Sequence, residues 1–309
     1  MLSNYTTIYD GLQNLDVDYV VFGICEDIGV FANYGKSGTS KAWMATLKVL
    51  LNIQSNQYTN ANRVCILGHL DYETELTELE SLNQKKKKDI LRARQLTEIV
   101  DKDVSYLVSS IIKAGKIPII IGGGHNNAYG NIKGCSLGLN TPINAINFDA
   151  HTDFRKEEGR HSGNGFTYAF TEGFLNKYYI FGLHENYTSQ SIFDKIHKLK
   201  QIGYCSYESI EVRKEKSFKK ALQEAQGFIS NKPFGIEIDC DAIENMPSSA
   251  QTPSGFSVRR ARQFLHHFAS NEHVSYLHIC EALPKKKQEP QVGKLITYLI
   301  TDFIKANGS

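Results

Sequence analysis

The stretch INAINFDAHTDFR, residues 143–155, is an apolar run that gives way abruptly to ionisable side chains. The apolar part predicts a strand over 143–148, because a strand buried on both faces of a parallel sheet is nearly continuous in apolar residues. Asp149, His151 and Asp153 follow it at i, i+2 and i+4. In extended backbone such side chains point to one side, so we expect these three groups to face a common point.

Seven further apolar runs of similar length predict strands, and longer helical stretches separate them. The expected strands lie at 18–24, 63–67, 117–121, 178–183, 201–204, 234–239 and 275–280. Helices are expected most clearly at 85–114, 214–229, 257–269 and 290–306. Strands that alternate with helices predict a doubly wound α/β fold with a mostly parallel sheet. No internal repeat and no Pro/Gly/Ser-rich linker interrupts the pattern, so we expect one domain over residues 1–309.

Bulk composition excludes several classes of protein. The formal net charge is only +2, from 35 basic and 33 acidic residues, so we expect no nucleic-acid partner. The longest apolar runs, such as 117–121, are too short to span a membrane. Residues 1–16 lack the basic and apolar regions of a secretory signal. The six cysteines have no C-x-x-C spacing and are interpreted as reduced thiols of a cytoplasmic protein.

Two more apolar runs end in groups that can bind metal ions. His125 follows IPIIIGGG, and Asp239 and Asp241 follow FGIEI. Ligands of open parallel sheets bind just beyond the carboxyl ends of the strands, so polar groups at three such ends can converge on one crevice. Taken alone, His125 is more often a structural histidine and Asp239–Asp241 a turn or helix cap. Together with the D-x-H-x-D pattern they predict a site with six ligands.

The ligand types favour two divalent ions. Four carboxylates and two imidazoles without a thiolate suit a cation such as manganese better than a structural zinc. Four aspartates placed close together repel one another strongly, and two dications balance their charge of −4. In two-metal sites the ions lie about 3.5–4 Å apart, and a bridging water can lose a proton near neutral pH. The cluster therefore predicts a hydrolytic centre whose nucleophile is a hydroxide.

At this point the sequence resembles the ureohydrolase family of arginases, agmatinases and formimidoylglutamases. Three family motifs occur in order: Gly-Gly-x-His ending at His125, Asp-Ala-His-x-Asp at 149–153, and Asp-x-Asp at 239–241. The segments CEDIGVFANYGKSG at 25–38 and CEALP at 280–284 are also similar to family elements. The resemblance implies a three-layer α/β/α fold with two manganese ions, and often a homo-oligomer.

The resemblance also implies a role for each matched residue. One ion is expected on His125, Asp149, Asp153 and Asp239. The other is expected on Asp149, His151, Asp239 and Asp241, with Asp149 and Asp239 bridging. Glu281 occupies the place of the family's glutamate that meets an amidinium or guanidinium group. Asp149 and Glu281 are therefore the expected catalytic residues.

Two departures from the family pattern leave these ligands intact. Gly124 stands where the family often has Asp before the motif histidine. After Asp241 the chain reads AIENMP, where Glu244 is expected to replace an acidic residue that orients a ligand.

The loop at 154–166 bears on the substrate. Ser162 and Asn164 match the Ser-Gly-Asn of arginases and are expected to contact substrate. Two residues after the Asn, arginases have a proton-shuttling histidine, and this chain has Phe166. The arginase reading is weakened, because a leaving amine needs a proton. His161 or His184 is an alternative donor, although each is more readily explained as a surface or structural histidine.

Arg155, directly after the second motif, resembles formimidoylglutamases. Its planar fork suits a substrate carboxylate, and Lys156 or Arg160 would assist with a substrate that has two. An ion pair with Glu157 or Glu158 is the plain alternative for Arg155.

We therefore expect hydrolysis of the C–N bond of N-formimidoyl-L-glutamate, a step of histidine degradation. Attack by the hydroxide on the formimidoyl carbon would give glutamate and formamide, with Glu281 stabilising the cationic amidine. The alternatives are an agmatinase, an arginase or another guanidino-acid hydrolase, which share every metal ligand. A one-zinc deacetylase predicts fewer acidic ligands, and a non-catalytic metal-binding protein usually lacks some of them.

Overall fold

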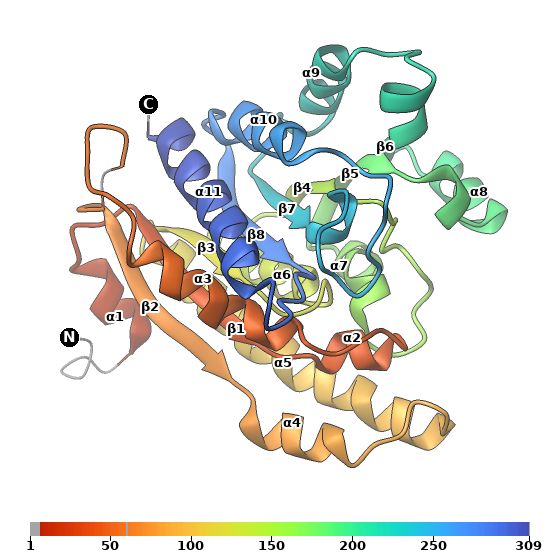
Figure 1. The fold of residues 1–309 in the computed structure, drawn as a ribbon, viewed down its shortest axis with the longest axis horizontal. Coiled ribbons are helices and arrows are strands. Elements are labelled where there is room, and N and C mark those ends of the chain that lie inside the picture. The colour runs from red at the N-terminus through yellow and green to blue at the C-terminus, as the bar shows by residue number, and fades with distance from the viewer. Residues whose placement is uncertain (1–6, 60, 309) are drawn as a thin grey trace.

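A sheet of eight parallel strands forms the centre of the computed structural model, which describes residues 7–59 and 61–308 (Figure 1). The strands are β1 Tyr19–Cys25, β2 Val64–Asp71, β3 Ile117–Ile121, β4 Ile143–Phe148, β5 Leu175–Leu183, β6 Ile202–Ser206, β7 Phe234–Asp239 and β8 Val274–Cys280. Their order is β2-β1-β3-β8-β7-β4-β5-β6, and every pair is parallel. All eight expected strands are confirmed within a few residues, as is the α/β fold class.

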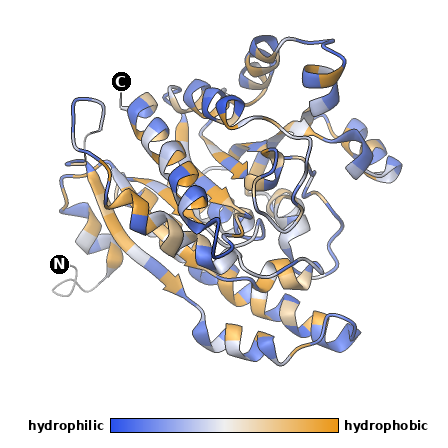
Figure 2. Cartoon of the chain, in the orientation of Figure 1, coloured by the Kyte–Doolittle hydropathy of each residue, from blue (hydrophilic) through white to orange (hydrophobic). Residues whose placement is uncertain are grey.

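Helices cover both faces of this sheet, which gives the three expected layers (Figure 1). One face carries α3 Ala42–Leu50, α9 Phe218–Ile229, α10 Val258–Ala269 and α11 Glu289–Asn307, and the other carries α1 Ile8–Gln13, α5 Lys87–Lys113, α6 Asn127–Leu139 and α7 Gly165–Thr171. Successive strand residues enter opposite cores, as Val20 and Val21 do. Figure 2 shows the outcome, with hydrophobic strands inside and hydrophilic outer helix surfaces.

Helix α6 was not among the helices expected from the sequence, and its glycines explain why. Gly130, Gly134 and Gly138 lower helix propensity and weaken the pattern. A Cβ added at Gly134 would lie 2.6 Å from the backbone oxygen of Ser105 in α5. The glycines therefore let α6 pack closely on α5, a requirement that only the packed pair of helices reveals. The helices α2 Ile28–Ala32, α4 Glu73–Glu80 and α8 Gln190–Lys198 complete the set of α-helices in the described residues.

The register of the four central strands aligns their carboxyl ends. Ile121 of β3 pairs with Ile279 of β8, Ile279 pairs with Ile238 of β7, and Ile238 pairs with Phe148 of β4. The residues that follow these four positions therefore leave the sheet at one level. None of the helices in the described part of the chain is long and apolar enough to traverse a lipid bilayer.

Candidate metal centre

The first group of predicted ligands converges around the ring of His125. Its Nδ1 lies 2.8 Å from Asp153 Oδ2 and 3.1 Å from Asp239 Oδ2. The same nitrogen lies 3.3 Å from Asp149 Oδ2. One ligand atom from each of the four residues lies within 4.8 Å of all the others, which is the spacing that one cation requires.

A second group shares Asp149 with the first. His151 Nδ1 lies 3.0 Å from Asp241 Oδ2 and 3.6 Å from Asp149 Oδ1. These three residues also offer ligand atoms within 4.8 Å of one another. Asp239 is absent from this second group, so its expected bridging role stays a prediction. The structure thus brings all six predicted ligands into two adjoining groups.

The backbone reaches this arrangement by turns, and the expectation of extended backbone at 149–153 is wrong. Strand β4 ends at Phe148, and Asp153 has a φ of 42°, in the left-handed region. Asp149 Oδ1 accepts a hydrogen bond from the His151 N–H at 2.7 Å. Asp239 Oδ1 likewise accepts from the Asp241 N–H at 2.8 Å. Each aspartate therefore uses one carboxylate oxygen to fold its own turn. The second oxygen of Asp149 also accepts from the Asn147 side chain at 2.8 Å.

The cluster carries more negative charge than the protein compensates. Burial raises the pKa of Asp239 well above its usual value, and the Asp241 and Asp149 carboxylates raise it further. Burial and Asp149 also raise the pKa of Asp153. Asp241 Oδ1 is buried and has no hydrogen-bond partner among residues 7–59 and 61–308. Oxygen donors crowded in this way fit two divalent cations, which would hold all four carboxylates ionised.

A glycine turn and a buried glutamate hold His125 in place. Gly122 and Gly123 have φ values of 93° and 69°, which glycine adopts without strain. Glu26 Oε1 accepts hydrogen bonds from the Gly124 N–H at 2.9 Å and from the Asn127 side chain at 2.7 Å. The sequence analysis did not single out Glu26, although an acidic residue directly after an apolar strand was a usable signal.

The structure also explains Gly124. A Cβ at this position would lie 2.6 Å from side-chain atoms of both Val30 and Asn126. The aspartate that the family often carries here therefore has no room in this chain.

Glu281 lies at the edge of the metal cluster. Its Oε1 accepts a hydrogen bond from the backbone N–H of His125 at 2.9 Å, and its Oε2 accepts one from the Ser249 hydroxyl at 2.6 Å. Its φ of 59° is left-handed, and its side chain is buried. Burial raises its pKa to about 7, although the two hydrogen bonds favour the ionised form. A carboxylate in this setting gains from a cationic partner.

Arg155 connects its own loop, residues 154–166, to Asn33 in the segment 25–38. It donates to Asn33 Oδ1 at 2.6 Å, and Asn33 donates to Ser162 Oγ at 3.0 Å. It also pairs with Glu158 at 2.9 Å, which is the alternative that the sequence left open. The Arg155 side chain is 45% exposed and therefore accessible to a ligand.

Arg160 and Asn164 instead build the loop. Arg160 is buried and paired with Asp101 of α5 at 2.8 Å, so it is not free for a substrate carboxylate. It also donates to Asn126 O at 2.9 Å and to Asn164 Oδ1 at 2.5 Å. Asn164 Nδ2 donates to Gly159 O at 2.8 Å. The Asn164 amide is thus occupied within the loop on both sides and offers no free group to a substrate.

Aromatic rings surround the two predicted histidine ligands. Phe166 stands edge-on to His125 at 5.2 Å between ring centroids, where the sequence predicts that no proton donor is present. His151 stacks on Tyr187 at 5.1 Å, and Tyr187 stacks on His184 at 5.0 Å. His161 is buried, with Nδ1 accepting from the Gly163 N–H at 3.1 Å, as expected of a structural histidine.

The glutamate that lies beside a predicted metal ligand is Glu237 and not Glu244. Glu244 is exposed, so the prediction that it supports the centre is wrong. Glu237, in the middle of β7, is buried, with Oε2 3.6 Å from His125 Nε2. His278 of β8 lies beside it. Neither residue was predicted from the sequence, although an ionisable residue inside an apolar strand is a signal for such a role.

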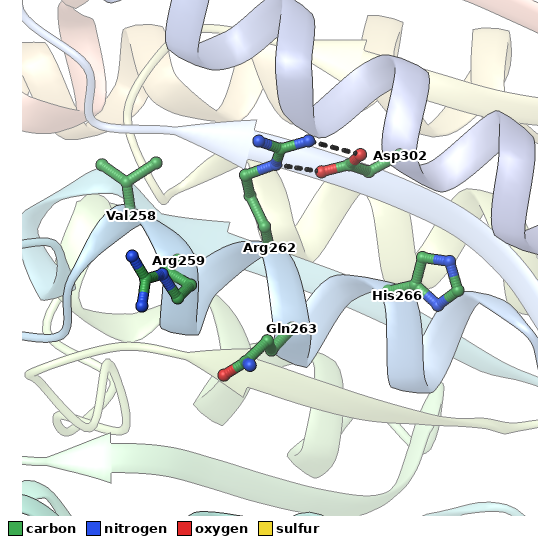
Figure 3. A pocket seen from close by; sticks show the side chains of 6 residues that line it. All are labelled: Val258, Arg259, Arg262, Gln263, His266 and Asp302. Atoms are coloured by element: carbon green, nitrogen blue, oxygen red, sulfur yellow. Dashed lines mark hydrogen bonds and ion pairs between the residues drawn. The ribbon is translucent and has the colours of Figure 1, made fainter. Parts of the chain in front are cut away.

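A hollow between α10 and α11 is remote from this chemistry (Figure 3). It is lined by Val258, Arg259, Arg262, Gln263, His266 and Asp302. Arg262 and Asp302 satisfy each other through two hydrogen bonds of 2.5 and 3.0 Å, and none of the predicted ligands lines the hollow. We therefore place the functional site at the cluster of the six predicted metal ligands, called the metal cluster below.

Comparison with known proteins gives a consistent picture. A model of the arginase family matches residues 17–304. A formimidoylglutamase of Streptococcus gordonii is 27% identical over 280 residues, covering 87% of this chain and 78% of the relative. A formimidoylglutamase of Streptococcus pyogenes serotype M12 is 26% identical over 278 residues, covering 86% and 77%.

Solved structures share the fold. Trypanosoma cruzi formiminoglutamase with Mn²⁺ superposes with a TM-score of 0.77 at 20% identity, covering 96% of this chain and 97% of that one. Formimidoylglutamase from Bacillus subtilis superposes with a TM-score of 0.72 at 17% identity, covering 95% and 88%. Because the family model spans nearly the whole chain, this protein belongs to the arginase family.

Proposed function

We propose that this chain is a two-manganese hydrolase that cleaves the C–N bond of N-formimidoyl-L-glutamate and releases L-glutamate and formamide. The observation that carries the proposal is the convergence of four aspartates and two histidines in two groups that share Asp149. Their crowded negative charge has no protein counter-charge of equal size, and two dications supply it. The six ligands would be His125, Asp149, His151, Asp153, Asp239 and Asp241.

The bound ions would lower the pKa of a water between them and so supply a hydroxide nucleophile near neutral pH. The protein's own part is to bind and orient the amidine. Glu281, anchored by the His125 N–H and the Ser249 hydroxyl, directs a carboxylate toward the cluster. An amidinium group of the substrate would pair with it and favour its ionised form.

The choice of substrate rests on the loop that follows the Asp-Ala-His-x-Asp motif. Arg155 is accessible and offers a planar cation two residues after Asp153, which suits a glutamate carboxylate. Phe166 places an apolar ring near His125, where an arginase-like reaction requires a proton donor. The curated relatives named formimidoylglutamase support the same substrate. Ser162 would assist at the mouth of the site through its contact with Asn33.

The test is turnover by the manganese-loaded protein. We expect formamide and glutamate from formimidoylglutamate, and little urea from arginine, agmatine or guanidinobutyrate. Urea release from one of these guanidines, without activity on formimidoylglutamate, would show that the proposed substrate is wrong and would leave the proposed metal chemistry in place. Elemental analysis showing fewer than two ions in each active chain would reject the two-metal proposal itself.

The setting of the enzyme belongs to the same proposal. We infer a single catalytic domain over residues 1–309, although the structure describes only 7–59 and 61–308 of it. We further infer a cytoplasmic location, a possible homo-oligomer, and no nucleic-acid partner, since the net charge is only +2. Sedimentation velocity of the purified chain would measure the oligomeric state.

A further inference from the structure

A buried set of polar side chains lies one layer deeper in the sheet than the metal cluster. Glu237 of β7 and His278 of β8 are cross-strand neighbours, and both are 0% exposed. Glu237 Oε2 lies 2.5 Å from His278 Nδ1, and Glu237 Oε1 accepts from the Tyr276 hydroxyl at 2.7 Å. Burying a carboxylate this deeply is costly unless it is paired and hydrogen-bonded, so the arrangement is a specific one.

The sheet makes room for this set by means of one glycine. Gly235 is the cross-strand neighbour of Tyr276, and a Cβ at Gly235 would lie 2.0 Å from the Tyr276 ring. The tyrosine therefore lies across β7, and its hydroxyl reaches Glu237 two residues further along the strand. On the far side, His278 Nε2 lies 3.3 Å from the Gly122 carbonyl, so the set also contacts the glycine turn before His125.

The free direction of Glu237 is toward the metal cluster. Its Oε2 lies 3.6 Å from His125 Nε2, while His125 Nδ1 faces three aspartates at 2.8–3.3 Å. A neutral imidazole carries its proton on one nitrogen and an acceptor lone pair on the other. A carboxylate behind Nε2 favours the proton there and leaves the Nδ1 lone pair for a cation. The Tyr276 hydroxyl and His278 Nδ1, at 2.7 and 2.5 Å from its two oxygens, both favour the ionised form of Glu237.

We propose that Glu237, held by Tyr276 and His278, is the positioning residue that keeps the proton of His125 on Nε2 and so presents Nδ1 to a divalent ion. The inference rests on the proposed two-metal function, and it is specific to one of the two ions. The group of Asp149, His151 and Asp241 has no contact of this kind with Glu237 among the described interactions.

The variant Glu237→Gln keeps the shape of the side chain and removes its charge. Manganese titration of the metal-free protein by calorimetry should show two binding events in the wild type. In the variant we expect one event to weaken by about 10–100-fold, the range known for outer partners of metal-bound histidines. The other event should stay unchanged. Glu185→Gln, on the surface beside Arg213, is the matched control and should bind as the wild type does.

A second readout uses protein loaded with a diamagnetic divalent ion. In the ¹H–¹⁵N spectrum of this histidine-labelled protein, assigned with a His125→Asn variant, we expect a slowly exchanging proton on His125 Nε2. Glu237→Gln should shift its resonance and speed its exchange with water. Unchanged affinity at both sites and an unchanged Nε2–H resonance, with only a lower melting temperature, would show that Glu237 merely packs the core. Equal weakening of both sites would also overturn the inference.

The outcomes separate this inference from the proposed function. A wild-type protein that binds no manganese contradicts the proposed function, whereas two binding events that are the same in the wild type and in Glu237→Gln contradict only this inference. If Glu237→Gln fails to fold, Tyr276→Phe takes its place, because it removes only the hydroxyl that holds Glu237 Oε1. Selective weakening of one site, smaller than that expected for Glu237→Gln, then supports the inference, and wild-type affinity at both sites refutes it.

Discussion

The cluster of predicted metal ligands and the loop that follows it, residues 154–166, both contain buried polar groups, yet these groups are matched very differently. In the loop, Arg160 satisfies Asp101 and Asn164 together. In the cluster, Asp241 Oδ1 has no hydrogen-bond partner in the described part of the chain, and the pKa of Asp239 is raised by burial and by neighbouring carboxylates. Matched polar groups indicate a scaffold, and unmatched charge indicates a site that awaits a ligand.

The largest effect is expected from a change in the metal cluster, where charge is unmatched. Asp239→Asn removes the charge of a predicted metal ligand beside His125 Nδ1. We expect turnover to fall by more than about 1,000-fold, because without paired ions nothing lowers the pKa of the attacking water toward neutrality. Manganese content and initial rates measure this. Asp302→Asn, in the remote hollow, should keep both at wild-type values. Two tightly held ions and normal turnover in Asp239→Asn would contradict the assignment.

The next largest effect is expected from a change in the loop, where buried polar groups are matched. Arg160→Met leaves Asp101 buried without its partner, and burial already raises the pKa of Asp101 to about 6 despite Arg160. We expect the free energy of unfolding to fall by about 3–5 kcal/mol, the usual cost of breaking a buried pair. Urea denaturation measures it. Arg92→Met, which breaks the exposed pair with Glu78, should change little. Equal losses in the two variants would mean that the buried pair has no special role.

A smaller effect concerns the pH dependence of the same scaffold. Burial lowers the pKa of His161 to about 3, from 6.5 in an unfolded chain, and the nearby Arg155 and Arg94 lower it further. Below pH 6.5 the unfolded chain therefore binds a proton that the folded protein does not bind. Stability is lost as pH falls from about 6.5 toward 3, by about 2 kcal/mol at pH 5.

His161→Asn keeps an acceptor for the Gly163 N–H and removes this titration. Unfolding free energies measured at pH 7.5 and pH 5 should therefore differ less in the variant than in the wild type. Parallel pH profiles for the two proteins would show that His161 is protonated in the folded state as readily as in the unfolded one.

The smallest effect sharpens the boundary between scaffold and site. Arg155 combines a feature of the scaffold, its ion pair with Glu158, with a feature of the site, a side chain that is 45% exposed. We expect Arg155→Gln to raise KM for formimidoylglutamate by about tenfold with little change in kcat, because a partly exposed charge-assisted contact is lost. Arg92→Gln, which removes an equally exposed arginine paired with Glu78, is the control and should leave KM unchanged. A loss of kcat at unchanged KM would place Arg155 in the scaffold instead.

The sequence alone determined the elements and the chemistry of the site. Apolar runs of strand length are local, so all eight strands were predictable, and the six ligand candidates were visible where three of those runs stop. Helix α6 escaped this reasoning because its glycines serve a contact with α5, which local propensity does not contain.

Only the tertiary structure decided which groups meet. The strand order places β3, β8, β7 and β4 side by side although they are far apart in the chain, and their register brings His125, Asp149, Asp239 and Glu281 to one level. It also separated the two arginines, burying Arg160 against Asp101 and leaving Arg155 accessible. The reason is that residue type and spacing specify a side chain's chemistry, whereas its partners depend on long-range packing.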